Sequence, residues 1–341
     1  MATQKKPSSI LESLNLSGLE NAIIESKSSV DDGGIAKTRA MAPVEDLGPL
    51  EGLVGQWAGT GFNIVQLPNR NIMHPDAPLN EKFTVVLNAT SETLQFDRIG
   101  GEVLNRGNVQ DDITFFGLHY LQQVSDVNLP VGKQGIHLET GLFLNIPKTG
   151  SDPISGPTVA RLGSIPHGDS LLAQGSFRTD EGPFHADFLP VEDTTPLLVQ
   201  ADGSTIPDPN QDYVNLVKNA TLPPGIPPGS ALNPNLVLAA ALGNQTIVRM
   251  TTIFLSTKDA GGIVNIPFVN NNAKALDFSA IFWLEEIEDP NGNFMQLQYT
   301  QKLFLEFEVF NKKGEFPEKL NVKWPHVSVG TLRLPAANST S

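Results

Sequence analysis

Apolar and polar residues alternate over most of the chain, in short stretches separated by glycine, proline and asparagine. A period of two places every second side chain on the same face, which is typical of β-strands with one buried face. The pattern predicts strands at residues 54–67, 82–89, 93–104, 112–124, 135–146, 158–163, 170–177, 245–256, 262–268, 275–287, 293–310 and 326–334. We therefore expect an all-β fold, a single antiparallel up-and-down barrel of about ten or more strands, with a sandwich as the alternative.

Two regions depart from this rhythm. Residues 1–47 are polar, and within them residues 10–26 carry apolar side chains at roughly helical spacing, which predicts a short helix, with a disordered tail as the alternative. Residues 186–245 are rich in proline and contain one regular stretch, a short helix at 236–242 that ends at Gly243. Loops of this length are usually functional or disordered. We expect a barrel domain at 48–337 whose insertion covers one mouth as a lid; a surface excursion is the alternative.

The last predicted strand carries His326, just after a corner formed by Trp324 and Pro325. Proline cannot donate to a strand ladder, so Pro325 is expected at the first residue of the strand or at an edge. Alternation then places His326, Ser328 and Gly330 on one face. A histidine on the inner face of a barrel is a candidate for holding an iron-bearing ligand.

Composition narrows the classes of partner. The net charge of −14 disfavours nucleic acid, which needs clustered Lys and Arg, and an anionic membrane surface. The chain has no cysteine, which excludes disulfides, zinc–thiolate sites and iron–sulfur clusters. Their absence fits a reducing compartment, and no stretch has the apolar core of a signal peptide or of a membrane span. We expect a cytoplasmic protein with no nucleic-acid or membrane partner.

Three stretches resemble the nitrobindin family, whose members are haem-binding, lipocalin-like barrels of ten strands. The first is Gly55-x-Trp57-x-Gly59-x-Gly61, in which the glycines also suggest close approach of another backbone and Trp57 would close the barrel floor. The second is His137-x-Glu139-x-Gly141-x-Phe143, and the third is Tyr299 followed by His326 and Leu332-Arg333. The resemblance covers 51–185 and 245–335. It implies haem b bound through His326 and chemistry on peroxide or reactive nitrogen species.

The chain also departs from that family. It is about twice the length of the single-domain members, and the family's His-Pro-x-Gly turn corresponds only to Pro166-His167-Gly168, with proline and histidine exchanged. The insertion at 186–245 has no counterpart. These departures indicate a distant, enlarged branch of the family.

The resemblance implies roles for individual side chains. His326 is the expected axial ligand of haem iron, and His167 the group over the open coordination site, as hydrogen-bond donor or acid–base catalyst. Arg161 and Arg249 are candidates for the haem propionates, and Trp283, with its neighbours Phe282 and Leu284, for a flat apolar slot. The structural alternatives are a half-exposed or solvated histidine, surface arginines and ordinary core packing.

Two other functions stay open. The barrel could carry a fatty acid or another apolar molecule without metal, because such barrels enclose a cavity suited to one ligand. It could also be a cofactor-free enzyme with His137 and Glu139 as acid–base groups, although a structural polar pair is an equally simple interpretation. The sequence contains no nucleophile elbow, phosphate loop or His-Glu-x-x-His pattern. The expected partner is a small molecule, a gas or a peroxide, and a homodimer is allowed for.

Overall fold

The structure is a computed structural model, and it describes residues 46–69, 83–108, 112–147, 158–199, 204–207, 212–310 and 319–334. These residues belong to one compact unit that begins at Glu45. The helix expected at residues 10–26 lies outside the described residues.

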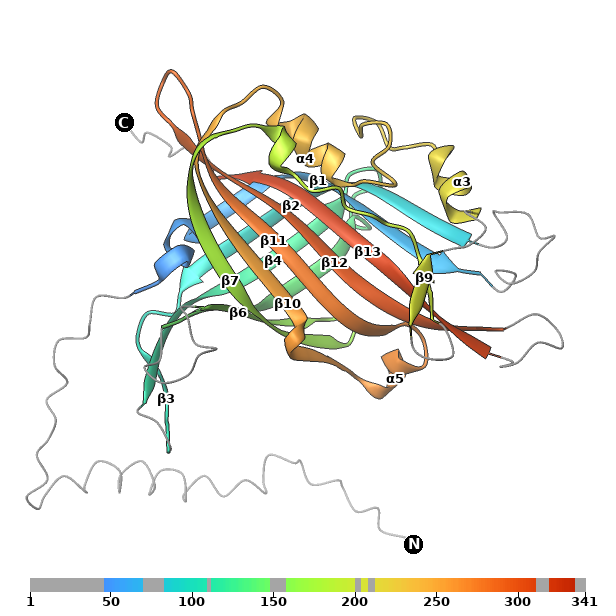
Figure 1. Ribbon diagram of the computed structural model, residues 1–341, viewed down its shortest axis with the longest axis horizontal. Helices are drawn as coiled ribbons and strands as arrows, with labels where there is room; N and C mark the ends of the chain where they lie inside the picture. Colours follow the sequence, from blue (N-terminus) through green and yellow to red (C-terminus); the bar gives the residue numbers. More distant parts are fainter. Residues whose placement is uncertain are drawn as a thin grey trace, which may run out of the picture. The chain divides into compact units, whose positions relative to one another are not determined.

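Ten antiparallel strands close into an up-and-down barrel, because each strand pairs with its neighbour along the chain and the first pairs with the last (Figure 1). This confirms the predicted fold class. The barrel strands are β1 (Gly55–Pro68), β2 (Phe83–Arg98), β4 (Ile113–Asp126), β5 (Gly135–Ile146), β6 (Thr158–Ile165), β7 (Asp169–Phe184), β10 (Ile247–Asn265), β11 (Lys274–Ile287), β12 (Phe294–Phe310) and β13 (Lys319–Arg333).

Several predicted boundaries differ from the observed ones. The two strands expected at 82–89 and 93–104 are one long strand, β2, followed by the short strand β3 (Val103–Asn105), which pairs with β4. The strands expected at 245–256 and 262–268 are likewise one strand, β10, whose pairing with β7 shifts between Ser256 and Gly261. In β10 the irregularity interrupts the alternation without ending the strand, which is why the sequence pattern predicted two strands there.

The seam between β1 and β13 depends on two glycines. A Cβ atom on Gly59 would lie 2.0 Å from the Thr331 carbonyl oxygen, and one on Gly61 would lie 2.1 Å from that of Val329. The two strands thus approach too closely for any side chain at these positions. The expected close backbone approach in this stretch is confirmed.

Proline is accommodated in β13 because the strand has one partner at that point. β1 pairs with residues 327–333 of β13, and the short strand β8 (Leu197–Val199) pairs with residues 322–323. Pro325 falls between these two sets, so its missing N–H costs no ladder bond. The strand therefore runs through the proline instead of beginning at it.

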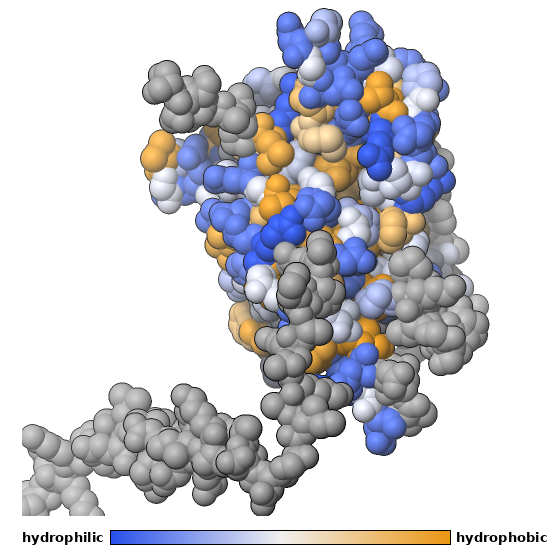
Figure 2. All heavy atoms as spheres, turned by 90° about the vertical axis from the view of Figure 1, so that its left-hand side faces the viewer, coloured by the Kyte–Doolittle hydropathy of each residue, from blue (hydrophilic) through white to orange (hydrophobic). Residues whose placement is uncertain are grey.

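The barrel interior is apolar at one end. The 3₁₀ helix η2 (Gly48–Leu53) inserts Leu50 and Leu53 against Trp57, whose indole Nε1 donates to the Leu53 carbonyl at 2.7 Å. Trp57 is fully buried, in agreement with its expected place at the barrel floor. We call this the η2 end, and the opposite end, which carries the turns at 127–134, 166–168 and 266–273, the histidine end. Figure 2 views the η2 end, where hydrophilic and hydrophobic residues are interspersed.

The Pro-rich segment covers the outer wall of the barrel. It contains the 3₁₀ helix η3 (Ala186–Phe188), the strands β8 and β9 (Thr205–Pro207), and the helices α3 (Asp212–Lys218) and α4 (Asn235–Leu242). α4 matches the predicted helix, and Gly243 follows it with a positive φ of 58°. The short helix α5 (Pro267–Asn270) lies between β10 and β11. Within the described ranges, no helix is both long and apolar enough to cross a bilayer.

Described residues of this segment lie against the outer wall, whereas a lid over a barrel mouth was the prediction. Gln298 of β12 donates to the Leu238 carbonyl of α4 at 3.0 Å, and Thr300 bonds the Asn235 side chain at 2.6 Å. These side chains point away from the interior, because their neighbour Tyr299 belongs to the interior cluster. The segment therefore packs on the wall, where a second apolar cluster joins α3 and α4 to β1, β10, β11 and β13.

Substituting Gly59 by alanine should open the seam. Its Cβ would meet backbone atoms that cannot move without displacing β13, so we expect the free energy of unfolding to fall by more than about 2 kcal/mol. Urea denaturation measures this. Gly101→Ala is the matched control, since a Cβ there meets nothing within 4 Å and should change stability by less than about 0.5 kcal/mol. Equal stability of the two variants would contradict the close seam.

Candidate functional site

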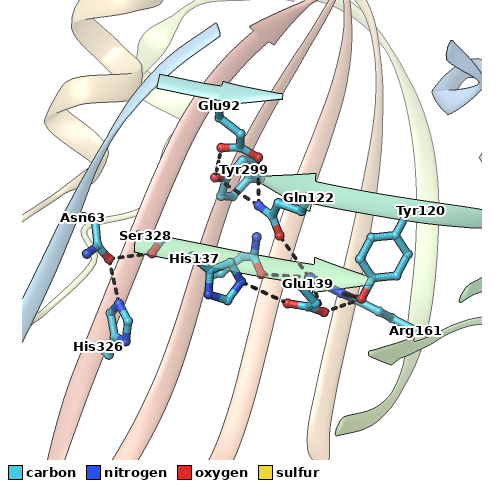
Figure 3. A network of polar contacts seen from close by, with 11 residues as sticks. Asn63, Glu92, Tyr120, Gln122, His137, Glu139, Arg161, Tyr299, His326 and Ser328 are labelled. Carbon is cyan, nitrogen blue, oxygen red and sulfur yellow. Dashed lines mark hydrogen bonds and ion pairs between the residues drawn. The ribbon is translucent and has the colours of Figure 1, made fainter. Parts of the chain in front are cut away.

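A layer of polar side chains crosses the middle of the barrel interior (Figure 3). Its members are buried, and all are connected through hydrogen bonds to one another. They come from strands that lie far apart in the sequence: Glu92 of β2, Tyr120 and Gln122 of β4, Glu139 of β5, Arg161 of β6 and Tyr299 of β12. The layer separates the apolar η2 end from the histidine end.

Arg161 is the centre of this layer. Its Nη2 donates to Glu139 Oε1 at 2.8 Å, its Nε to the Tyr120 hydroxyl at 3.1 Å, and its Nη1 to Gln301 Oε1 at 2.9 Å. Its guanidinium carbon also lies 5.1 to 5.6 Å from the ring centres of four aromatic residues, among them Phe278. All three nitrogens are thus occupied. A buried ion pair of this kind is costly to break, by about 3–5 kcal/mol when one partner is removed.

Burial and pairing compete in setting the charge of this pair. Burial alone would raise the pKa of Glu139, but the Arg161 guanidinium and hydrogen bonds from His137 and Tyr120 outweigh it and lower the pKa to about 2. Burial would likewise lower the pKa of Arg161, and the Glu139 carboxylate raises it instead. Both groups therefore stay ionised near neutral pH.

Glu92 behaves differently from Glu139. Burial raises its pKa to about 7, although hydrogen bonds from Tyr299 and Gln122 act in the opposite direction. Gln122 Nε2 donates to Glu92 Oε1 at 2.8 Å, and the Tyr299 hydroxyl donates to the other carboxyl oxygen. One carboxyl of the layer is thus ionised while the other is poised to exchange a proton near neutral pH.

Two glycines make room for the layer. A Cβ on Gly163 would lie 2.3 Å from Glu139 Oε1, and one on Gly330 would lie 2.6 Å from the Tyr299 ring. Neither glycine needs an unusual φ, so the requirement is space rather than backbone conformation. The expected inward face of His326, Ser328 and Gly330 is confirmed by this contact and by the bonds described next.

A chain of amides ties His326 to a buried carboxylate. Asp126 Oδ2 accepts from Asn88 Nδ2 at 2.7 Å, Asn88 Oδ1 accepts from Asn63 Nδ2 at 3.2 Å, and Asn63 Oδ1 lies 2.6 Å from His326 Nε2. The Ser328 hydroxyl donates to the same Asn63 oxygen at 2.8 Å. We call this series the amide relay; Figure 3 shows the part that joins Asn63, Ser328 and His326.

The relay determines where the proton of His326 lies. A carboxylate only accepts, so Asn88 must donate with its NH₂ group and Asn63 must do the same. Asn63 then offers only its oxygen to His326, and Nε2 must carry the hydrogen. Nδ1 keeps its lone pair, with no hydrogen bond recorded to it within the described ranges. Burial, with the charges of His137 and His167, lowers the pKa of His326 to about 4, so the ring is neutral at pH 7.

Two further histidines lie close together at this end. His137 Nε2 is 3.5 Å from Glu139 Oε2, and its ring centre is 5.9 Å from that of His167 in the β6–β7 turn. Burial, followed by the charge of His137, lowers the pKa of His167. The expected shared face of His137 and Glu139 is confirmed by this contact. The inner wall here is partly exposed at His326, Ser328, Leu303 and Gln301.

The structure separates the residues expected around haem. Trp283 packs on the outer wall with its ring 5.8 Å from that of Phe188, because it alternates with Phe282 and Leu284 of the interior cluster. Arg249 is exposed near the start of β10, where it faces Glu181 at 3.6 Å, at the other end of the barrel from His167. Arg161 lies inside but is fully engaged. Among the expected residues, His326 and His167 are at the same end.

Haem b fits part of this arrangement. The macrocycle brings four nitrogen ligands, so one neutral histidine on the inner wall is enough from the protein, and His326 meets this requirement. The two arginines expected to bind the haem propionates do not fit, because the donors of Arg161 are occupied and Arg249 lies at the other end of the barrel. For a bare metal ion, the described ranges hold no group of three His, Cys, Asp or Glu side chains close enough to bind one.

A groove of about 560 Å³ lies on the outer wall instead of the interior. It crosses β7, β10, β11 and β12 beside the Lys302–Glu192 ion pair, whose Nζ–Oε1 distance is 2.6 Å. Its floor contains small hydroxyl side chains such as Ser256 and Ser279 next to Phe254. It shares no residue with the polar layer or the amide relay.

Replacing Glu92 by glutamine should flatten the pH dependence of stability. The pKa of Glu92 is raised in the folded state, so its contribution is present below pH 4.5 and is lost as pH rises through 7, by up to about 3 kcal/mol. Urea unfolding at pH 5 and pH 8 measures the loss in both proteins. The contributions of other groups, His326 included, cancel in the comparison. An identical loss in Glu92→Gln would show that Glu92 is ionised in the folded protein.

Comparison with known proteins adds little to this geometry. No protein-family model matches the chain, and no curated protein matches it. A similar solved structure is the crystal structure of Rv2717c from M. tuberculosis, with 13% identity, 85% of this chain and 98% of that chain covered, and a TM-score of 0.37. A likeness this distant implies nothing about ligand or activity. The closed ten-stranded barrel is confirmed, and membership of the nitrobindin family stays a prediction.

Proposed function

We propose that the protein is a small-molecule-binding barrel whose ligand occupies the histidine end, and that the ligand is haem b with His326 as its axial ligand. The observation that supports this most is the amide relay. A relay of three buried side chains that ends on one imidazole nitrogen fixes the tautomer and leaves the other nitrogen able to bind. Histidines that ligate metals commonly have their second nitrogen held in this way.

His137 and His167 are the other titratable side chains of this end that could contact a bound ligand. The ring centres of His137 and His167 lie 5.9 Å apart, and His167 lies in an exposed turn. Haem, when bound, supplies reactivity toward peroxide or reactive nitrogen species. The protein's part would be to hold the iron through His326, to offer hydrogen bonds from His167, and to keep a carboxyl poised at Glu92.

A metal-free carrier of an apolar molecule is the second candidate. Leu303, Ile165 and Ile263 face inward, are partly exposed, and continue the interior cluster toward the histidine end. An acyl chain could pack along them. A cofactor-free enzyme based on His137 and Glu139 has less support, because a carboxylate with a pKa near 2 is a weak base at neutral pH.

Hemin titration followed by the visible spectrum tests the first candidate. We expect a sharp Soret band in the wild type that is lost or strongly shifted in His326→Ala. His119→Ala is the matched control, because His119 is exposed and bonds Thr140 across the outer face. Arg249→Ala should also leave the band unchanged. A band that is indifferent to His326→Ala would exclude His326 as the ligand.

The Asn63→Ala variant then tests the relay. Removing the acceptor of Nε2–H should weaken hemin affinity at least tenfold if the relay supports ligation through Nδ1. Tighter binding would mean that iron competes with Asn63 for Nε2. If hemin does not bind at all, displacement of a fluorescent fatty acid distinguishes the metal-free carrier from an empty barrel.

A further inference from the structure

Large apolar side chains are exposed on the turns of the histidine end. Val131 is 93% exposed, Phe268 75% and Ile266 52%, and Val127 and Leu129 are exposed in the same turn as Val131. None of them belongs to either apolar core cluster. We call these five residues the apolar rim. Exposed apolar side chains that gather at one place usually mark an interaction surface.

The turns that carry the apolar rim are neighbours along part of the barrel edge. The turn at 127–134 joins β4 to β5, the turn at 166–168 joins β6 to β7, and α5 joins β10 to β11, so the three connections follow one another in the sheet. The ring of His137, in β5 just after the first turn, has its centre 5.9 Å from that of His167 in the second turn. The Ile266 N–H donates to the Gly168 carbonyl at 2.9 Å and links the second turn to the third.

Charge distinguishes these turns from the rest of the protein. Residues 127–134, 166–168 and 264–273 include a single Asp, Glu, Lys or Arg, which is Lys133. The whole chain is 18% charged with a net charge of −14. The turns that carry the apolar rim are thus almost uncharged in an acidic protein, and their polar side chains include several asparagines and His167.

The shape of the rim favours a lipid surface over a protein partner. The apolar side chains project from separate turns and alternate with asparagine and glycine, so they form isolated points instead of one continuous face. A protein interface needs a packed, continuous core, whereas a bilayer surface accepts separate apolar side chains and offers hydrogen-bond partners to the polar groups between them.

We propose that the histidine end docks reversibly on a zwitterionic lipid surface through the apolar rim. The net charge led us to expect no membrane partner, but that argument concerns anionic lipid and averages over the whole chain. Docking places the site of the proposed function toward the bilayer, where apolar ligands dissolve. The docking argument itself rests on exposure and charge and does not depend on which ligand is bound.

Sedimentation with phosphatidylcholine vesicles tests the proposal on the full chain. We expect the wild type to sediment with the vesicles, and Val131→Ser with Phe268→Ser to reduce the partition coefficient at least tenfold. Both side chains are exposed, so the double variant should keep its far-ultraviolet circular dichroism. Val191→Ser is the matched control, since Val191 is 78% exposed on the segment that covers the outer wall, and it should bind as the wild type does.

Three results would overturn the proposal. They are wild-type protein that stays in the supernatant with phosphatidylcholine, binding that appears only when anionic lipid is added, and equal binding by the double variant. Light scattering after gel filtration identifies the competing explanation. A dimer that the double variant converts to monomers, without vesicle binding, would assign the rim to contact between two copies of the chain.

Discussion

The Arg161–Glu139 ion pair is the constraint to which the barrel interior is adapted. Two opposite charges in a medium of low polarity attract strongly, and both require their remaining hydrogen-bonding positions to be filled. Tyr120, Gln122 and Gln301 fill those positions, and four aromatic rings enclose the guanidinium. On one side of the pair the interior is apolar as far as η2. The other side is more polar and contains His137, His167 and His326.

The outer wall shows the same principle of satisfied burial. β12 presents Gln298, Thr300 and Lys302 outward, a pattern that would ordinarily face water. The segment at 186–245 covers them and accepts a hydrogen bond from each, through a backbone carbonyl, a side-chain amide oxygen or a carboxylate. These hydrogen bonds, together with the apolar contacts of α3 and α4, hold the Pro-rich segment against the wall.

The fold could be predicted from the sequence because alternation in each strand is a local signal. The glycines of the β1 seam, the inward face of His326 and the helix α4 followed from the same local rules. The polar layer could not be predicted in this way. Glu92, Gln122 and Tyr299 are single polar residues on otherwise ordinary strands, and only the register of the closed barrel brings them together.

Arg161 illustrates the limit. Its position in a strand was predicted correctly. A haem propionate was considered as its partner, because the sequence does not show that Glu139 of β5 lies next to it in the barrel. Asn63, Asn88 and Asp126 were missed for a similar reason. The alternation places all three on the inner face of neighbouring strands. Because buried polar side chains need hydrogen-bond partners, this could have predicted that they bond to one another. The outward position of Trp283 could have been read from its alternation with Phe282.

The seam has a consequence for how the chain folds. It joins residues 58–64 to residues 327–333, so the contact that closes the barrel spans nearly the whole described sequence. Contacts of such sequence separation form late, because the entropy of the intervening chain must be lost first. During synthesis, β1 leaves the ribosome long before β13 exists, and its free edge must wait unpaired. Because Asn63 on β1 bonds His326 on β13, the amide relay cannot be completed until the last strand has arrived.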